Sequence, residues 1–491
     1  MNAISWLMEK SSRRHTRKIL FILWALYGVS RAVYYVLGVR FDSSLVLGDS
    51  MSLVPYDLLQ SSLLESVWHF HSQPPLFSLF CGIIVKLFGG WPTAVFHVVF
   101  ILTGLILVGG LYTLMVSLGI PYRLAAILTA LFSISPDTIL YENIIFYTYP
   151  VAMMLVLSGL TLYRYVKTAD RRWGLATFAL WSLIILTRSM FHLVWFVAGV
   201  MIVLVLIPRL WKRTLMLALI PFLLAFGWYV NNYMMFGFFG SSSWMGMNLA
   251  RITVNVLTPE ERVALAREGE VSELVFLRPF PGFWQFSGNI DVPRADSTGV
   301  PILDLQHFRS GFSNYNHMVQ LGLAGRFLED SFTIIRKNPV RYVSRCLTNS
   351  YGLYFAPTNA FFFLFETETV YKNNYRLLEP FIRVWNAVWY GDFSSEVENS
   401  AWFILALYPL IIGYWLYRLM RSFRTMRKNA PFYSVIFFAL MTVLYVTLIG
   451  NLFELGENMR FRYNVDPLML TLFGLMLVDL LNGFNRSRNA P

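Results

Sequence analysis

The sequence predicts an all-α protein that crosses a membrane many times, and three observations support this fold class. Hydrophobic residues make up 56% of the 491 residues and charged residues only 14%. The mean hydropathy is +0.53. Apolar blocks of about 20 residues, the length that crosses the hydrocarbon of a bilayer as a helix, recur along the chain. This composition excludes a soluble domain.

Apolar windows of this length predict about ten transmembrane helices. We interpret the first as a retained helix rather than a signal peptide, because its apolar run is long enough to span and no small-residue cleavage site accompanies Arg31. In chain order, the expected spans are 18–38, 93–117, 122–136, 146–165, 173–188, 190–208, 213–235, 401–419, 431–450 and 464–482.

Basic clusters between the apolar blocks indicate the orientation. By the positive-inside rule they face the cytoplasm, and the alternate connections face the other side of the membrane. The net charge of +12 then records orientation and does not indicate a nucleic-acid partner. The clusters are Arg13 to Lys18, Arg123, Arg164 to Arg172, Arg209 to Arg213, Arg418 to Lys428, and Arg486 with Arg488.

Two segments of the first outer loop, residues 39–92, predict helices that lie on the membrane. The apolar run from Pro75 to Phe88 is only about 14 residues long and contains Lys86, so it is too short for a span. If it crossed the membrane, every later basic cluster would face outward, so we expect an interfacial helix there. Residues 55–66 predict a second one.

The chain is expected to have three parts. Residues 1–235 form an N-terminal transmembrane catalytic module, 236–400 a large outer loop, and 401–491 the C-terminal transmembrane helices. The large loop contains a capping box with proline in the first helical turn, at Thr258 to Glu261. Residues 325–354 predict helices broken at Pro339, and we expect the loop to be an ordered cap on the membrane surface.

Acidic side chains in the outer connections are the candidates for catalysis, because carboxylates at a bilayer are costly to place. Asp49 is our first choice for a general base, with helix capping as the equally weighted alternative. Asp42 and Asp57 are further candidates, although Asp57 also suits a helix start. Glu142 is expected either to orient an acceptor or to satisfy the adjacent helix.

Arginines at the same boundary are candidates for binding phosphate. Arg188 interrupts an apolar tract and is expected either to snorkel to lipid headgroups or to bind a phosphate with two hydrogen bonds. Arg460 and Arg462, read as part of an extended stub before the last span, could hold a phosphate while Glu457 pairs with them or with a sugar. Ion pairing alone explains this cluster equally well.

Two histidines of the first outer loop, His69 and His71, lie near Gln73. A metal ion is possible there, but no third ligand stands at a recognisable offset, so hydrogen bonding at the interface is the preferred interpretation. Cys81 and Cys346 add no metal-ligand spacing and are expected to be packing residues.

Together these motifs resemble the GT-C superfamily of integral-membrane glycosyltransferases, which includes protein O-mannosyltransferases and the aminoarabinose transferase of lipid A. The resemblance extends over most of the chain, and the order of its short motifs carries it. The motifs are Asp49 with Tyr56, the element His71-Ser72-Gln73-Pro74-Pro75-Leu76, the turn at Pro136, Leu186-Thr187-Arg188, Asn231-Asn232-Tyr233, and Arg460-Phe461-Arg462-Tyr463.

The resemblance implies a sugar donor on a polyprenyl phosphate and an acid of the first outer loop as the base. Carried onto this chain, it makes Asp49 the base and Arg188, Arg460 and Arg462 the phosphate-binding cations. Tyr56, His71, Gln73 and Tyr463 are expected around the substrates. Asp49 precedes Tyr56 by seven residues, whereas related enzymes often have about four, so Asp42 and Asp57 stay open.

The expected reaction is an inverting transfer to a hydroxyl of a glycan, lipid or protein acceptor. No cofactor is required, because the lipid phosphate is already a good leaving group; a divalent metal is possible but not indicated. The expected location is a bacterial inner membrane with the site facing the periplasm, with the endoplasmic reticulum as the alternative. Two other functions stay open: a lipid or solute transporter or flippase, and a lipid-linked glycan polymerase or ligase.

Overall fold

The computed structural model describes residues 3–285, 296–360, 375–391, 402–422 and 424–488. Within these ranges the secondary structure is helical and no strand forms, although Asp42 and Ile144 make an isolated parallel bridge. This agrees with the predicted all-α class. Residue 401, where one expected span begins, and parts of the large loop lie outside the described residues.

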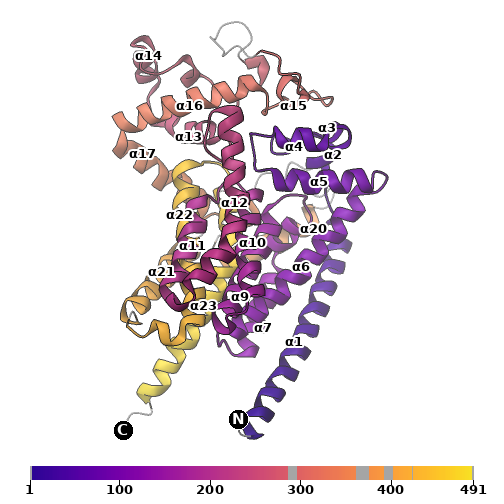
Figure 1. Ribbon diagram of the computed structural model, residues 1–491, viewed down its shortest axis with the longest axis vertical. Coiled ribbons are helices and arrows are strands. Elements are labelled where there is room, and N and C mark those ends of the chain that lie inside the picture. The colour runs from indigo at the N-terminus through magenta and orange to yellow at the C-terminus, as the bar shows by residue number, and fades with distance from the viewer. Residues whose placement is uncertain (1–2, 286–295, 361–374, 392–401, 423, 489–491) are drawn as a thin grey trace.

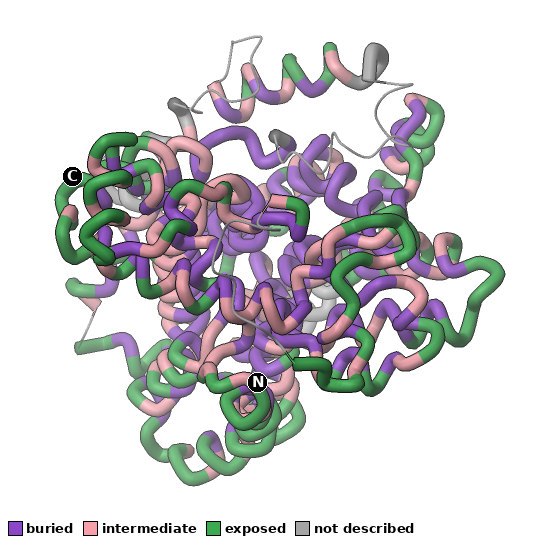
Figure 2. Tube along the Cα trace, turned by 90° about the horizontal axis from the view of Figure 1, so that it is seen from above, coloured by how far each residue is buried: buried purple, intermediate pink, exposed green. Residues whose placement is uncertain are grey.

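Long helices form a bundle with α9 (Thr148–Thr168) at its centre, packed against α6, α10, α22 and α23. Seen from above, buried residues gather in the middle of the molecule and exposed ones around it (Figure 2). The bundle also contains α1 (Ala3–Val36), α6 (Pro92–Ser117), α7 (Tyr122–Ile134), α8 (Pro136–Glu142), α10 (Arg171–Thr187), α11 (Leu193–Leu206), α12 (Trp211–Phe236), α21 (Trp402–Ser422), α22 (Ala430–Phe453) and α23 (Asn458–Arg488).

Five described helices are long and apolar enough to cross a membrane, or six if the bent pair α7 and α8 is one span. The expected count of about ten is not reached. Helices form at the other expected places, but α10 has 17 residues and α11 has 14. Helix α9 is long enough, but it buries polar residues such as Ser158 and Thr161 against its neighbours. Serine and threonine side chains inside a helix bundle can form hydrogen bonds there instead of facing lipid.

The pair α7 and α8 bends by 57° at Ser135. Pro136 begins α8 there, and the Ser135 hydroxyl caps α8 by accepting a hydrogen bond from the N–H of Thr138. Proline restricts the residue before it to extended backbone, which is where Ser135 lies, with ψ 142°. The backbone directly after α8 pairs with the first outer loop, where Asp42 and Ile144 form the isolated bridge.

The first outer loop folds into short helices: α2 (Ser44–Leu47), α3 (Tyr56–Ser61), α4 (Leu63–Trp68) and α5 (Pro75–Leu87). Helix α5 has 13 residues, in agreement with the short helix expected there. The helix expected over 55–66 is instead two helices, because α3 ends at Ser61 and α4 begins at Leu63.

The large outer loop forms a cap over the bundle, at the end opposite both termini (Figure 1). The capping box at Thr258 is present, and a helix boundary falls at Pro339 as expected. The backbones of α13 and α16 pack closely: a Cβ added to Gly246 would lie 2.0 Å from the Ala324 carbonyl oxygen. The cap helices are α13 (Met245–Thr253), α14 (Pro259–Arg267), α15 (Pro301–Asp304), α16 (Met318–Lys337) and α17 (Pro339–Arg345). Two later helices of the loop pack against the bundle instead: α18 (Tyr351–Tyr354) against α22 and α23, and α20 (Tyr375–Tyr390) against α21.

Candidate active site

Asp42 is held by the chain segment that follows α8. Its N–H donates to the Asn143 carbonyl at 2.7 Å, and its own carbonyl accepts from the N–H of Ile145 at 3.0 Å. Asp42 is only 4% exposed. Its Oδ1 accepts from the N–H of Ser44 at 2.7 Å, whereas its buried Oδ2 has no hydrogen-bond partner among the described residues. A buried carboxylate oxygen without a partner is costly and therefore notable.

Arg188 lies directly after α10, where the backbone becomes extended. Its side chain is 2% exposed. The guanidinium carbon is 4.9 Å from the Phe461 ring centroid and 5.4 Å from that of Tyr147. Nη1 donates to Asn464 at 3.4 Å, but Nη2 has no partner and no carboxylate lies within ion-pair distance in the described structure.

The environment of Arg188 is unfavourable for a cation. Burial, and next the positive charge of Arg460, lower the pKa of Arg188 to about 9. The guanidinium is still protonated at neutral pH, so a positive charge is buried here without a compensating carboxylate of its own.

Arg460, in the first turn of α23, has its own partner. It forms an ion pair with Glu457, and its Nη1 donates to the Tyr147 hydroxyl at 3.2 Å. Tyr147 therefore lies beside both Arg460 and Arg188. Because Tyr147 follows the segment that pairs with Asp42, one stretch of backbone, 143–147, connects the buried acid to the two buried arginines.

A second acid–base pair borders this cluster. Glu454, just after α22, pairs with Arg251 of the cap at 3.2 Å. Burial raises the pKa of Glu454 to about 7, against the opposing effect of Arg251. The cap therefore contributes a charge to the edge of the cluster.

Arg462 points away from Arg460, which corrects the expected extended stub. Both residues lie within α23. Since a helix turns about 100° per residue, side chains two apart face nearly opposite directions. Arg462 is buried and donates to the carbonyls of Tyr354 and Ala356 at 2.8 and 2.9 Å. Its guanidinium thus holds the backbone after α18.

Asp49 and Asp57 contact the large loop. Asp49 has a left-handed backbone, φ 61°. Its Oδ1 accepts from the N–H of Tyr56 at 3.2 Å, as the capping alternative expects, and its Oδ2 accepts from the Ser310 hydroxyl at 2.7 Å. Asp57 pairs with the exposed Arg309 at 3.0 Å. Both acids therefore attach the tip of the large loop to the first outer loop.

Glu142 is buried and forms a pair with Arg31 of α1. Its Oε1 accepts from Arg31 Nε at 2.9 Å, and its Oε2 accepts from Arg31 Nη2 at 2.5 Å and from the Tyr149 hydroxyl at 2.6 Å. Arg31 was not among the candidates from the sequence. The signal for it was available, because a charge inside an apolar span is expected to have a buried partner.

His71 and Gln73 join the first outer loop to other segments. His71 is fully buried; its Nδ1 lies 2.8 Å from the Ser243 hydroxyl and its Nε2 lies 2.9 Å from the Asn316 carbonyl oxygen. Burial lowers the pKa of His71 to about 3, so the ring is neutral. Gln73 accepts a long hydrogen bond from Ser189, 3.4 Å, next to Arg188.

Two further expectations can be placed. Tyr463 is buried, with its ring 4.3 Å from that of Tyr141. Tyr56 accepts from Gln60 through its hydroxyl and lines an open cavity. Among the described residues, no group of three or more His, Cys, Asp or Glu side chains is placed to hold a metal ion. The buried cluster thus consists of arginines, tyrosines and acids.

Comparison with known proteins gives one structural similarity. No protein-family model and no curated protein matches the sequence. The archaeal oligosaccharyltransferase AglB from Archaeoglobus fulgidus, in complex with an inhibitory peptide and a dolichol-phosphate, aligns with a TM-score of 0.41 and 13% identity. The alignment covers 98% of this chain and 52% of that one, so this chain spans about half its length. Similarity at this level carries no argument about function.

Proposed function

We propose that this protein is a membrane glycosyltransferase that moves a sugar from a polyprenyl-phosphate donor to a hydroxyl group at the cap side of the membrane. The observation that carries the proposal is Arg188. It is a buried guanidinium with no carboxylate partner and with Nη2 unpaired among the described residues, and one backbone segment links it to the buried Asp42.

A bound phosphate would resolve the unfavourable burial of Arg188. Leaving a charge buried without a partner costs several kcal/mol, of order 3–5. A phosphate oxygen accepting from Nη2 would compensate that cost, and the planar guanidinium suits phosphate geometry. Arg460 supports the same site from the other side of Tyr147.

Asp42 is the general base that the geometry favours. Its Oδ2 is buried and free to accept a proton, whereas both carboxylate oxygens of Asp49 already accept hydrogen bonds and Asp57 pairs with Arg309 at the surface. A base must come within hydrogen-bond distance of the proton that it removes, and Asp42 Oδ2 has no competing donor among the described residues. This choice replaces Asp49, which its position in the first outer loop and the family resemblance favoured.

The proposed reaction is one displacement. Asp42 takes the proton of the acceptor hydroxyl as the acceptor oxygen bonds to the anomeric carbon. The bond from that carbon to the phosphate oxygen breaks, and its electron pair leaves with the lipid phosphate. Arg188 and Arg460 stabilise the charge that develops on the phosphate. Attack opposite the leaving group inverts the anomeric centre.

The proposed partners are a polyprenyl-phosphate sugar from the bilayer and a glycan, lipid or protein acceptor. A bacterial inner membrane with the site facing the periplasm suits the basic clusters at the end that carries both termini. A polymerase or ligase of lipid-linked glycans would differ in the size of its product. A transporter would move a lipid or solute across vesicles without forming a covalent product.

The phosphate site can be tested by binding. Native mass spectrometry of the detergent-solubilised protein would compare a polyprenyl phosphate with the uncharged polyprenol. We expect the phosphate form to bind at least tenfold more tightly, and Arg188→Gln to remove that preference. Arg309→Gln is the matched control, because Arg309 is exposed and pairs with Asp57 at the surface. Equal affinity of the two lipids for the unmodified protein would contradict the phosphate site.

The base can be tested by turnover, using a panel of polyprenyl-phosphate sugars and analysis of products by mass. Asp42→Asn should keep the affinity for polyprenyl phosphate but lower transfer by about 10²- to 10⁴-fold. Asp49→Asn should retain most of the activity, since its contacts are structural. The assignment fails if Asp49→Asn abolishes transfer while Asp42→Asn does not. Flux of the donor lipid across vesicles without any product would indicate a transporter.

A further inference from the structure

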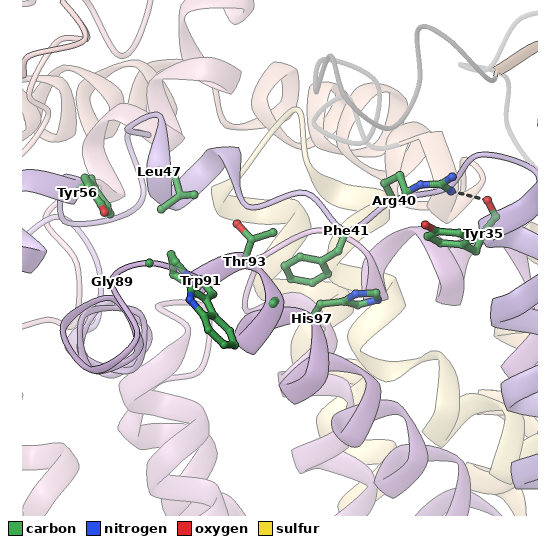
Figure 3. Close-up of a pocket in the computed structure, with 12 residues that line it drawn as sticks. Tyr35, Arg40, Phe41, Leu47, Tyr56, Gly89, Trp91, Thr93 and His97 are labelled. Atoms are coloured by element: carbon green, nitrogen blue, oxygen red, sulfur yellow. Dashed lines mark hydrogen bonds between the residues drawn. The ribbon is translucent and has the colours of Figure 1, made fainter.

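An open cavity of about 730 Å³ lies between the outer ends of α1 and α6. Arg188 is not among the residues that line it: the end of α1 and the first outer loop, including the turn at Gly89 to Pro92, form its walls (Figure 3). Its volume is in the range of small-ligand sites, roughly 300–1,000 Å³. Aromatic and polar side chains line it, among them Tyr35, Arg40, Phe41, Trp91, Thr93 and His97.

The cavity opens at the level where two candidate spans end. The span in α1 ends at Val36 and the span in α6 begins at Pro92, and both helices contribute lining residues at those ends. Tyr35 and Trp91 are 56% and 76% exposed. Exposed tyrosine and tryptophan at helix ends are typical of the boundary between hydrocarbon and headgroups. A ligand can therefore enter this cavity from the headgroup layer.

Arg40 supplies a fixed positive charge at the cavity. Its Nη1 donates to the carbonyls of Tyr35 and Val39, and its guanidinium carbon lies 3.6 Å from the centroid of the Tyr35 ring. It has no ion pair within the described residues. Thr93 and Ala94, in the first turn of α6, also line the cavity, and the N-cap residue Trp91 makes no side-chain cap. An uncapped helix start next to an arginine favours an anion.

We propose that this cavity binds the phosphate-bearing headgroup of an anionic membrane lipid, as a second lipid site separate from the one at Arg188. Arg40 pairs with the phosphate, the aromatic side chains contact the glycerol or sugar part of the headgroup, and the acyl chains remain in the bilayer beside α1 and α6.

The site adjoins the segment that carries Asp42. The Phe41 ring lies 5.1 Å from the His97 ring, centroid to centroid, at the cavity wall. On the other side of Asp42, the Ser43 hydroxyl lies 2.7 Å from the Thr93 hydroxyl. A lipid in the cavity would therefore contact Phe41 directly and Ser43 through the lining residue Thr93.

The test is lipid binding to the full-length protein in detergent, measured by native mass spectrometry. The probes are phosphatidylglycerol, phosphatidylcholine, soluble glycerol 3-phosphate and a polyprenyl phosphate. We expect phosphatidylglycerol to bind at least tenfold more tightly than phosphatidylcholine. Arg40→Gln should weaken phosphatidylglycerol at least tenfold and leave polyprenyl phosphate unchanged.

A second variant fills the cavity instead of removing its charge. Gly90 lines the cavity, and a Cβ added there meets nothing within 4 Å, so Gly90→Trp is expected to fold and to weaken phosphatidylglycerol as Arg40→Gln does. The matched control is Gly325→Trp in the cap, where an added Cβ also meets nothing within 4 Å.

Three results would overturn the proposal. One is phosphatidylglycerol affinity that neither Arg40→Gln nor Gly90→Trp changes. Another is glycerol 3-phosphate binding as tightly as phosphatidylglycerol, which would indicate a free phosphate compound rather than a lipid. The third is loss of polyprenyl-phosphate binding in Arg40→Gln and Gly90→Trp but not in Arg188→Gln. That result would make the cavity the donor site and would contradict the proposed function as well. Failure of Arg188→Gln alone would contradict only the proposed function.

Discussion

The buried pair of Glu142 and Arg31 gives a prediction that separates structure from catalysis. Arg31 donates two hydrogen bonds to the Glu142 carboxylate and Tyr149 donates one, and Glu142 is 1% exposed. The site has little room for water, because a Cβ added to Gly104 of α6 would lie 2.7 Å from Glu142 Oε2. Glu142→Leu should therefore leave the Arg31 charge uncompensated and cost about 3–5 kcal/mol of unfolding free energy.

A double variant distinguishes this explanation from a general packing defect. Replacing both partners, Arg31→Met with Glu142→Leu, removes the stranded charge and should recover most of that loss. Chemical unfolding in mixed micelles measures both variants against the unmodified protein, with Asp57→Asn as an exposed-pair control that should cost no more than about 1 kcal/mol. A double variant as unstable as Glu142→Leu alone would refute the reasoning.

Two further predictions concern His71 and Arg462. The pKa of His71 is about 3 in the folded protein, below the value of about 6.5 in the unfolded chain. Between these two pH values the unfolded chain binds a proton that the folded protein does not. The free energy of unfolding therefore falls as the pH drops from 6.5 towards 3, by up to about 1.4 kcal/mol per pH unit. In melting experiments at pH 7.5 and 5.0, the variant His71→Asn should melt at a lower temperature than the unmodified protein at pH 7.5. Its melting temperature should then fall less between pH 7.5 and pH 5.0. An equal fall in melting temperature for the two proteins would contradict this. Arg462→Gln strands two buried carbonyls and should cost about 1–3 kcal/mol for each, while the polyprenyl-phosphate affinity of its folded fraction stays within twofold. A large loss of affinity would return Arg462 to the phosphate site.

The sequence predicted the helical class well because hydropathy and helix-boundary chemistry are local properties. The short helix α5, the capping box at Thr258 and the break at Pro339 depend on a few neighbouring residues. The number of spans also depends on how the helices pack against one another. Helix α9 is surrounded by other helices, and its polar residues lower its hydropathy without indicating where it lies.

The candidate residues were harder to rank, because their roles depend on distant partners. Asp49 and Asp57 were candidates because they are acids of the first outer loop. Their partners, Ser310 and Arg309, lie more than 250 residues away in the chain. The sequence predicted the same role for Arg460 and Arg462. Their side chains point in nearly opposite directions, because both residues lie in helix α23. The sequence included Asp42 among the candidates but could not rank it above Asp49, because the unpaired Oδ2 of Asp42 is visible only in the folded chain.

The charge balance of the buried cluster fits the proposed reaction in one specific respect. Glu457 pairs with Arg460 and Glu454 with Arg251, which leaves the charge of Arg188 uncompensated. In the proposed reaction a donor phosphodiester carries one negative charge, whereas the released lipid phosphate carries up to about two at neutral pH. The extra charge develops as the sugar leaves. The positive charge of Arg188 is not fully neutralised before the reaction. It therefore stabilises the transition state more than it stabilises the bound donor, and this difference is what accelerates the step.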